Sequence, residues 1–135
     1  EPYRRQRQMC IETEVLDLVN VQRANNGLSP VVLGDEKLNA AAQQRAVEIA
    51  TVTSHTRPDG TSCFTVLDDF NVTDEATGEN AAWGQVTPEE VVNDWMNSEG
   101  HRANILNPDA HKMGFGYYSD NSSEWGRQWI QIFTE

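Results

Sequence analysis

Basic residues are scarce in this sequence. Its 135 residues include 10 Lys and Arg against 21 Asp and Glu, which gives a formal net charge of -11 at pH 7. Nucleic acids and anionic membranes are recognised by clustered Lys and Arg, so neither is expected as the main partner. The one basic cluster, Arg4, Arg5 and Arg7, stands at the chain end, and residues 1–9 are interpreted as a solvated tail or linker remnant.

Long apolar runs are absent as well. A membrane-spanning helix needs about 20 consecutive apolar residues, and no stretch approaches that length, so no transmembrane segment is expected. The sequence shows no signal peptide, yet it begins with Glu1 and not with Met, which indicates a trimmed chain. The length fits a single domain, which we place at residues 10–135 and expect to be a monomer.

Cysteine is the third scarce residue type. Cys10 and Cys63 are too far apart for a CxxC redox motif or a zinc knuckle. They could form one disulfide, which would close a loop of about fifty residues and contribute nominally ~4 kcal/mol. They could also be two free, buried thiols, because cysteine is often simply a small buried hydrophobic residue. The residues alone leave both alternatives open.

The first half of the chain shows helical periodicity. A helix is predicted from Met9 to Asn25, and a second one runs from the cap residue Asp35 to Ser54. The apolar stripe of the second helix is mostly alanine, so this helix can approach its neighbour closely. Leu28–Gly34 is apolar but contains Pro30, so it is predicted to be a loop that packs and not a central strand. A short helix is predicted at 64–70.

A well-marked helix begins after residue 87. Thr87-Pro88-Glu89-Glu90 has the pattern of a capping box with proline at the first helical position. Apolar residues at helical spacing follow (Val91, Val92, Trp95 and Met96), so one face is predicted to be buried. Ser98 can cap a second helix, 99–106, whose first turn contains His101. The positive end of a helix disfavours imidazolium, so His101 is expected to be neutral.

The last part of the chain changes to a period of two. Lys112–Tyr118 alternates apolar residues with Gly114 and Gly116, and Arg127–Phe133 alternates again after a segment rich in turn residues. These patterns predict an antiparallel hairpin. In the second strand, Trp129 and Phe133 point to one face, and Ile130 and Ile132 point to the other. Helices are therefore expected on both faces, which gives an α+β layered sandwich.

Four ordered motifs resemble the CAP superfamily of cysteine-rich secretory, antigen 5 and pathogenesis-related proteins, in its bacterial SCP-like branch. They are SHTRPDG at 54–60, GEN at 78–80, WMNSEGHRANIL at 95–106 and MGFG at 113–116, and the likeness covers 11–133. The resemblance implies an α-β-α sandwich around a three-stranded antiparallel sheet, with Glu79 on or beside the third strand. It also implies a secreted or cell-surface protein, which favours the disulfide between Cys10 and Cys63.

The resemblance also implies a cleft lined by two histidines and two acidic residues, in which a divalent cation, often zinc, can bind. His55, Glu79 and His101 match three of these positions, and Ser98 stands where the fourth, a glutamate, is expected. Two imidazoles and one carboxylate form a recurrent zinc set that leaves a position open for water. Asn104 is expected beside the cleft in a structural role.

Three classes of function remain open. The first is a non-enzymatic module of an extracellular or cell-envelope protein, whose acidic cleft binds a cation or a cell-wall component. The second is a peptidase or esterase in which a histidine with Glu79, or a metal-bound water, performs the hydrolysis. Ser98 permits a serine nucleophile, although no GxSxG elbow is present. The third is lipid binding, for which no amphipathic basic helix is found. The first class is preferred, and no catalytic residue is assigned.

Overall fold

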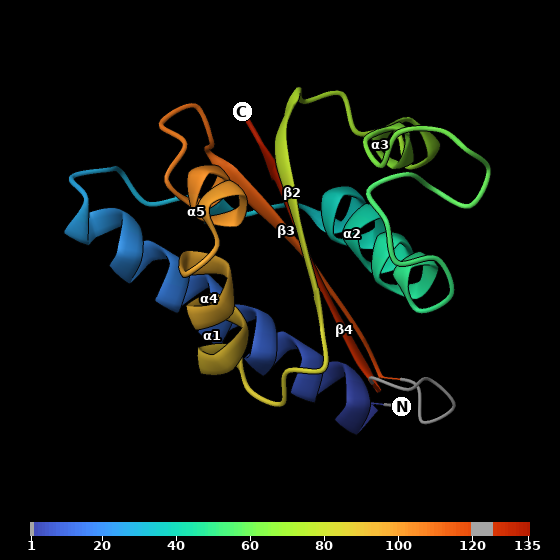
Figure 1. The fold of residues 1–135 in the computed structure, drawn as a ribbon, viewed down its shortest axis with the longest axis horizontal. Coiled ribbons are helices and arrows are strands. Elements are labelled where there is room, and N and C mark those ends of the chain that lie inside the picture. The colour runs from blue at the N-terminus through green and yellow to red at the C-terminus, as the bar shows by residue number, and fades with distance from the viewer. Residues whose placement is uncertain (1, 120–125) are drawn as a thin grey trace.

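The computed structural model describes residues 2–119 and 126–135, with side chains from Gln6 onward. The elements in chain order are α1 (Pro2–Asn25), β1 (Val32–Leu33), α2 (Glu36–Ile49), α3 (Thr65–Asp69), β2 (Ala76–Trp83), α4 (Pro88–Met96), α5 (Glu99–Ile105), β3 (Lys112–Ser119) and β4 (Arg127–Thr134). The sheet separates α1, α4 and α5 on one face from α2 and α3 on the other (Figure 1). The predicted α+β arrangement with helices on both faces is confirmed.

The sheet has the strand order β1-β3-β4-β2. β4 pairs antiparallel with both β3 and β2, so the predicted hairpin is confirmed. The prediction of three antiparallel strands is wrong, because β1 adds a fourth strand that pairs in parallel with β3. The Val32 N–H donates to the His111 carbonyl at 2.9 Å. Pro30 lies outside the paired residues, and a two-residue strand is too short to show a periodic pattern.

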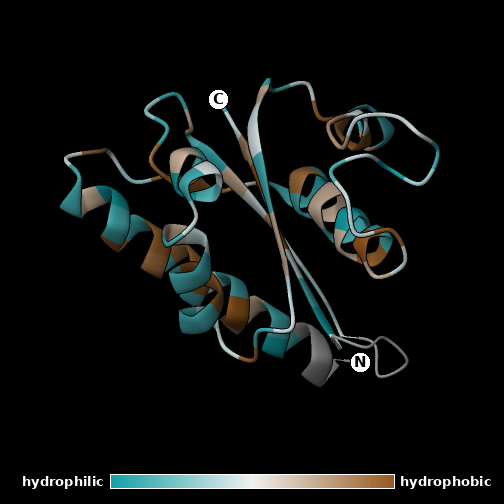
Figure 2. Cartoon of the chain, in the orientation of Figure 1, coloured by the Kyte–Doolittle hydropathy of each residue, from teal (hydrophilic) through white to brown (hydrophobic). Residues whose placement is uncertain are grey.

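The two faces of β4 carry the two halves of the hydrophobic core. Trp129 and Phe133 pack with buried residues of α1, α4 and α5. Ile130 and Ile132 pack with α2 and α3. This is the division that the alternation in β4 predicted. Figure 2 shows a corresponding pattern in the helices, where hydrophobic and hydrophilic residues alternate along the ribbon because each helix buries one face.

Helix α2 approaches β3 closely through small residues on both elements. A Cβ atom at Gly114 would lie 2.9 Å from the Leu38 carbonyl oxygen, and one at Gly116 would collide with the Ala42 carbonyl oxygen. The glycines of β3 and the alanines of α2, which the sequence identified separately, therefore face each other. This contact fixes the position of α2, whose Arg45 enters the functional site.

Several element ends differ from the predicted ones. α1 begins at Pro2 and not at Met9. The sequence did not predict this start, because the first turns of the helix are polar and show no apolar periodicity. α2 ends at Ile49, five residues before the predicted end, and α3 is one residue shorter at each end. The Thr87 side chain accepts from the Glu90 N–H, so the predicted N-cap of α4 is confirmed. The turn predicted before β4 includes 120–125, which lie outside the described residues, as do the Arg4 and Arg5 side chains.

The predicted disulfide is absent. Cys10 and Cys63 are both free thiols, the first exposed and the second buried. Cys10 lies on α1, which packs on one face of the sheet, whereas Cys63 lies immediately before α3, which packs on the other. The sheet therefore separates the two sulfur atoms. The disulfide that the resemblance favoured is therefore not formed in this structure.

Candidate functional site

The loop that carries His55 is a small hydrogen-bonded hairpin. Thr56 and Ser62 form an isolated antiparallel bridge, and the Cys63 N–H donates to the His55 carbonyl at 2.8 Å. Gly60, with φ of 90°, supplies the left-handed turn residue that the Pro-Asp-Gly sequence requires. The consequence for the site is that Cys63 is held next to His55, although seven residues lie between them.

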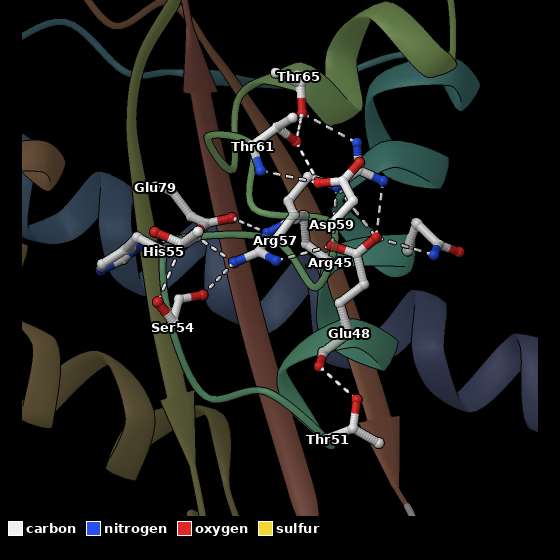
Figure 3. Close-up of polar contacts among 12 residues, drawn as sticks. Arg45, Glu48, Thr51, Ser54, His55, Arg57, Asp59, Thr61, Thr65 and Glu79 are labelled. Carbon is white, nitrogen blue, oxygen red and sulfur yellow. Dashed lines mark hydrogen bonds and ion pairs between the residues drawn. The ribbon is translucent and has the colours of Figure 1, made fainter.

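Glu79 lies in β2 and is 4% exposed. Arg45 donates to its carboxylate twice, from Nε at 2.8 Å and from Nη2 at 3.2 Å. His55 Nδ1 contacts Oε1 of the same carboxylate at 2.8 Å. Figure 3 shows the three side chains converging from β2, α2 and the loop. Burial raises the pKa of Glu79, but the hydrogen bonds from His55 and Arg45 outweigh this effect and hold it below its ordinary value.

A second carboxylate completes the ion network around Arg45. Glu48 accepts from Arg45 Nη1 at 2.8 Å and from Arg57 Nη2 at 2.8 Å (Figure 3). Burial acts to raise the pKa of Glu48, but the hydrogen bonds from Arg57 and Arg45 lower it to about 2. Arg57 also pairs with Asp69 at 2.7 Å, which ties the hairpin loop to α3. The carboxylates of Glu48 and Glu79 are thus paired with the guanidinium groups of Arg45 and Arg57.

Sequence reasoning missed Arg45, which is 0% exposed. The signal that could have found it is its place on the apolar stripe of α2, since Leu38, Ala42, Arg45 and Ile49 recur at helical spacing. A charged residue on a buried stripe needs a buried partner of opposite charge. Glu79, on the edge strand β2, is that partner.

His55 and His101 differ in their surroundings. The His55 side chain is 58% exposed, and its hydrogen bonds to Cys63 and Glu79 raise its pKa to about 10. His101 contacts Ser98 Oγ through Nδ1 at 3.0 Å. Burial, together with the nearby charge of His55, lowers the pKa of His101. The direction agrees with the predicted neutral form, but the cause is burial and a neighbouring histidine.

Ser98 stands at the start of α5 without capping it, because its side chain makes no hydrogen bond to the helix amides. Its hydroxyl group contacts His101 instead. Both side chains open into a groove of about 220 Å³, which is also lined by Trp83, Gln85, Asp94 and Trp95. The groove therefore runs from the end of β2 to the first turn of α5.

Two asparagines join α5 to β2 behind the groove. Asn80 donates to the His101 carbonyl at 3.1 Å. Asn104 donates to the Glu79 carbonyl at 3.2 Å and to Asn80 Oδ1 at 2.8 Å. Gly78 leaves room for Asn104, since a Cβ atom there would meet its side chain. These bonds hold His101 and Glu79 at a fixed distance, which is the structural role expected of Asn104.

The structure brings only part of the expected metal set together. Among the described residues, one group has ligand atoms that all lie within 4.8 Å of one another, namely His55, Cys63 and Glu79. His101 does not belong to this group, because it lines the neighbouring groove. Among the described residues, His55, His101 and Glu79 do not form a group of this kind, and Cys63 is the third member beside His55 and Glu79.

The sequence of this chain matches a known family. The family model of the cysteine-rich secretory proteins, CAP, matches residues 16–133. The chain belongs to this family. Across the described residues, no helix has the length and hydropathy needed to cross a bilayer.

Individual proteins and solved structures are similar to most of this chain. YkwD of Bacillus subtilis (strain 168) is 40% identical over 121 residues, which make up 88% of this chain and 46% of YkwD. A structure of an extracellular SCP-domain protein from Bacillus anthracis has a TM-score of 0.80 and 25% identity, over 91% of this chain and 39% of that one. An outer surface protein from Borrelia burgdorferi shares the fold, with a TM-score of 0.77 and 21% identity over 90% of this chain and 89% of its own. The chain thus spans less than half the length of the first two.

Proposed function

We propose that this chain is a non-enzymatic binding module of the extracellular space or cell envelope, and that it binds cell-wall glycan in the groove beside His101. The observation that carries the proposal is the full use of the Glu79 carboxylate by Arg45 and His55. A carboxylate engaged in this way is poorly placed to take a proton from water or from a nucleophile. Its role in the site is to hold side chains in position. The extracellular and outer-surface origin of the solved relatives supports the location.

The groove offers the contacts that a sugar chain needs. Trp83 lines the groove, is 40% exposed and presents a flat apolar ring on which a sugar can stack. Asp94, Ser98 and His101 supply polar atoms in the same groove, which suits the hydroxyl groups of a sugar. Gln85 lines the same groove, and its Oε1 atom is buried without a hydrogen-bond partner among the residues that the structure describes.

Co-sedimentation with purified bacterial cell-wall glycan tests the proposal. The wild type should pellet with the glycan, and Trp83→Ala and His101→Ala should each weaken binding at least tenfold, or about 1.4 kcal/mol. Val21→Ala, which alters an exposed residue on α1, serves as the control and should bind like the wild type. The proposal is wrong if the wild type stays in solution or if all variants pellet equally.

A hydrolase is the second candidate, and the contact between Ser98 Oγ and His101 Nδ1 favours it. A histidine with a lowered pKa beside a serine hydroxyl is the first half of a nucleophilic pair. In the described parts of the chain, however, no carboxylate hydrogen-bonds the His101 ring to orient it, as a triad would require. A panel of peptide and ester substrates distinguishes the two. Turnover that is lost in Ser98→Ala would establish the hydrolase and overturn the non-enzymatic function.

A further inference from the structure

We propose that His55, Cys63 and Glu79 form a binding site for a thiophilic transition-metal ion such as Zn²⁺, with the Cys63 thiolate as the decisive ligand. The site is separate from the groove beside His101 and does not depend on glycan binding. An imidazole, a thiolate and a carboxylate together match the ligand types that zinc accepts. Cys63 has no disulfide partner, so its sulfur atom is available for this role.

The distances suit one small ion. One potential ligand atom from each of the three residues lies within 4.8 Å of the other two. A tetrahedral ion with bonds of about 2.0 to 2.3 Å separates its ligand atoms by roughly 3.3 to 3.8 Å. His55 Nδ1 and Glu79 Oε1, now 2.8 Å apart, would therefore have to separate slightly when the ion binds.

Three separate segments hold the ligands in place before any ion arrives. The hairpin loop fixes Cys63 against His55 through the 2.8 Å bond between the Cys63 N–H and the His55 carbonyl. Arg45 fixes Glu79 on β2 through a 2.8 Å bond to Oε2 and a longer bond of 3.2 Å to Oε1, and Oε1 also contacts His55 at 2.8 Å. A ligand set that is already ordered loses less entropy when it binds.

The exposure of the three residues suits a site that exchanges its ion. Cys63 and Glu79 are each 4% exposed, whereas the His55 side chain is 58% exposed. Solvent therefore reaches the cluster from the His55 side, where a water molecule can complete the coordination shell. The buried side keeps the thiolate and the carboxylate in a setting of lower dielectric, which strengthens their attraction for a cation.

The proton balance of binding is simple. The ion takes the position of the hydrogen between His55 Nδ1 and Glu79 Oε1, and the proton from Nδ1 goes to solvent. Cys63 releases its thiol proton and binds as a thiolate. Arg45 already forms an ion pair with Glu79. The pairing reduces the attraction of that carboxylate for a cation, so Glu79 is the weakest of the three ligands. Removing the sulfur should therefore cost more affinity than removing the carboxylate.

Titration of the metal-free, fully reduced protein with Co²⁺ tests the proposal. Cobalt bound to a thiolate has a charge-transfer band in the near ultraviolet, so the spectrum reports the ligand directly. The wild type should develop this band, and Zn²⁺ should displace it. Cys63→Ser should lose the band, and His55→Ala should bind Co²⁺ at least tenfold more weakly, because even the loss of a residue that only supports a ligand typically costs about tenfold or more in affinity.

Two control variants make the outcome specific. Cys10→Ser removes the exposed thiol on the other face and should leave the band unchanged. His101→Ala should leave it unchanged as well. Because the His55 side chain is largely exposed, His55→Ala should fold even if Cys63→Ser does not. The proposal is overturned if the wild type gives no band, if the band survives in Cys63→Ser or persists undiminished in His55→Ala, or if it is lost in Cys10→Ser or His101→Ala.

Discussion

Arg45 is the residue on which the buried charges of the site depend. It is fully buried and bonds to Glu48, to Glu79 and to the Ser54 carbonyl. The sequence motifs identified His55 and Glu79 because both lie in short ordered patterns. They could not identify the pairing of Arg45 with Glu79, because the two residues lie 34 positions apart and meet only after α2 has packed on the sheet.

Replacing the buried carboxylate tests this pairing. Glu79→Gln keeps the side-chain shape but leaves the Arg45 charge with Glu48 alone. Loss of one partner from a buried ion pair costs about 3 to 5 kcal/mol. We expect the free energy of unfolding, measured with urea, to fall by about 3 kcal/mol because one partner remains. Asp74→Asn, which breaks the exposed pair with Lys112, should cost under about 1 kcal/mol. Equal effects of the two variants would contradict the assignment.

The pH dependence of stability follows from Glu48. Its pKa falls from an ordinary 4.5 to about 2 in the folded protein. A lowered pKa stabilises the folded state above pH 4.5, and this contribution is lost as the pH falls through 2. The difference corresponds to about 3 kcal/mol. We expect the melting temperature of the wild type to fall between pH 4.5 and 2 by more than that of Glu48→Gln. Parallel curves for the two proteins would show that Glu48 is not the responsible group.

At the scale of elements, features that depend on neighbouring residues were predicted better than features that depend on residues distant in the sequence. The N-cap at Thr87 and the alternation of β3 and β4 depend on neighbouring residues, and both are confirmed. β1 was missed because its two residues become a strand only by pairing with β3, about 80 positions later in the chain. The ends of helices are equally hard to locate from the sequence, as the early start of α1 shows.

The contact between α2 and β3 gives an element-scale prediction. Gly116→Ala would place a Cβ atom against the Ala42 carbonyl, and overpacking of this kind costs about 1 to 3 kcal/mol. Gly100→Ala is the matched control, because a Cβ atom in that helix meets nothing within 4 Å. Alanine in a helix is favoured over glycine by about 0.5 to 1 kcal/mol. Thermal denaturation should therefore show opposite shifts, and a stable Gly116→Ala would mean that α2 lies farther from the sheet.

At the scale of the whole molecule, the sheet decides which distant residues can meet. It brings together Arg45, His55 and Glu79 from three elements. It also keeps α1 and its Cys10 away from the site. The resemblance to the family supplied the order of the motifs and the positions of His55, Glu79 and His101. It could not supply the pairing of the cysteines, because that depends on the face on which each segment of this particular chain packs.

The separated thiols give a prediction for the intact protein. Protein prepared without reductant and then denatured should react with an alkylating agent at both Cys10 and Cys63, as mass measurement would show. In the native state, the exposed Cys10 should react first and the buried Cys63 slowly. A reductant should leave the melting temperature unchanged, whereas losing a real disulfide would lower the stability by about 2 to 5 kcal/mol. Denatured protein that takes up no alkylating agent would mean that the two cysteines are bridged. In that case the hairpin loop at 55–63 could not sit on the α2 face of the sheet as described, and Cys63 would not be free to bind a metal.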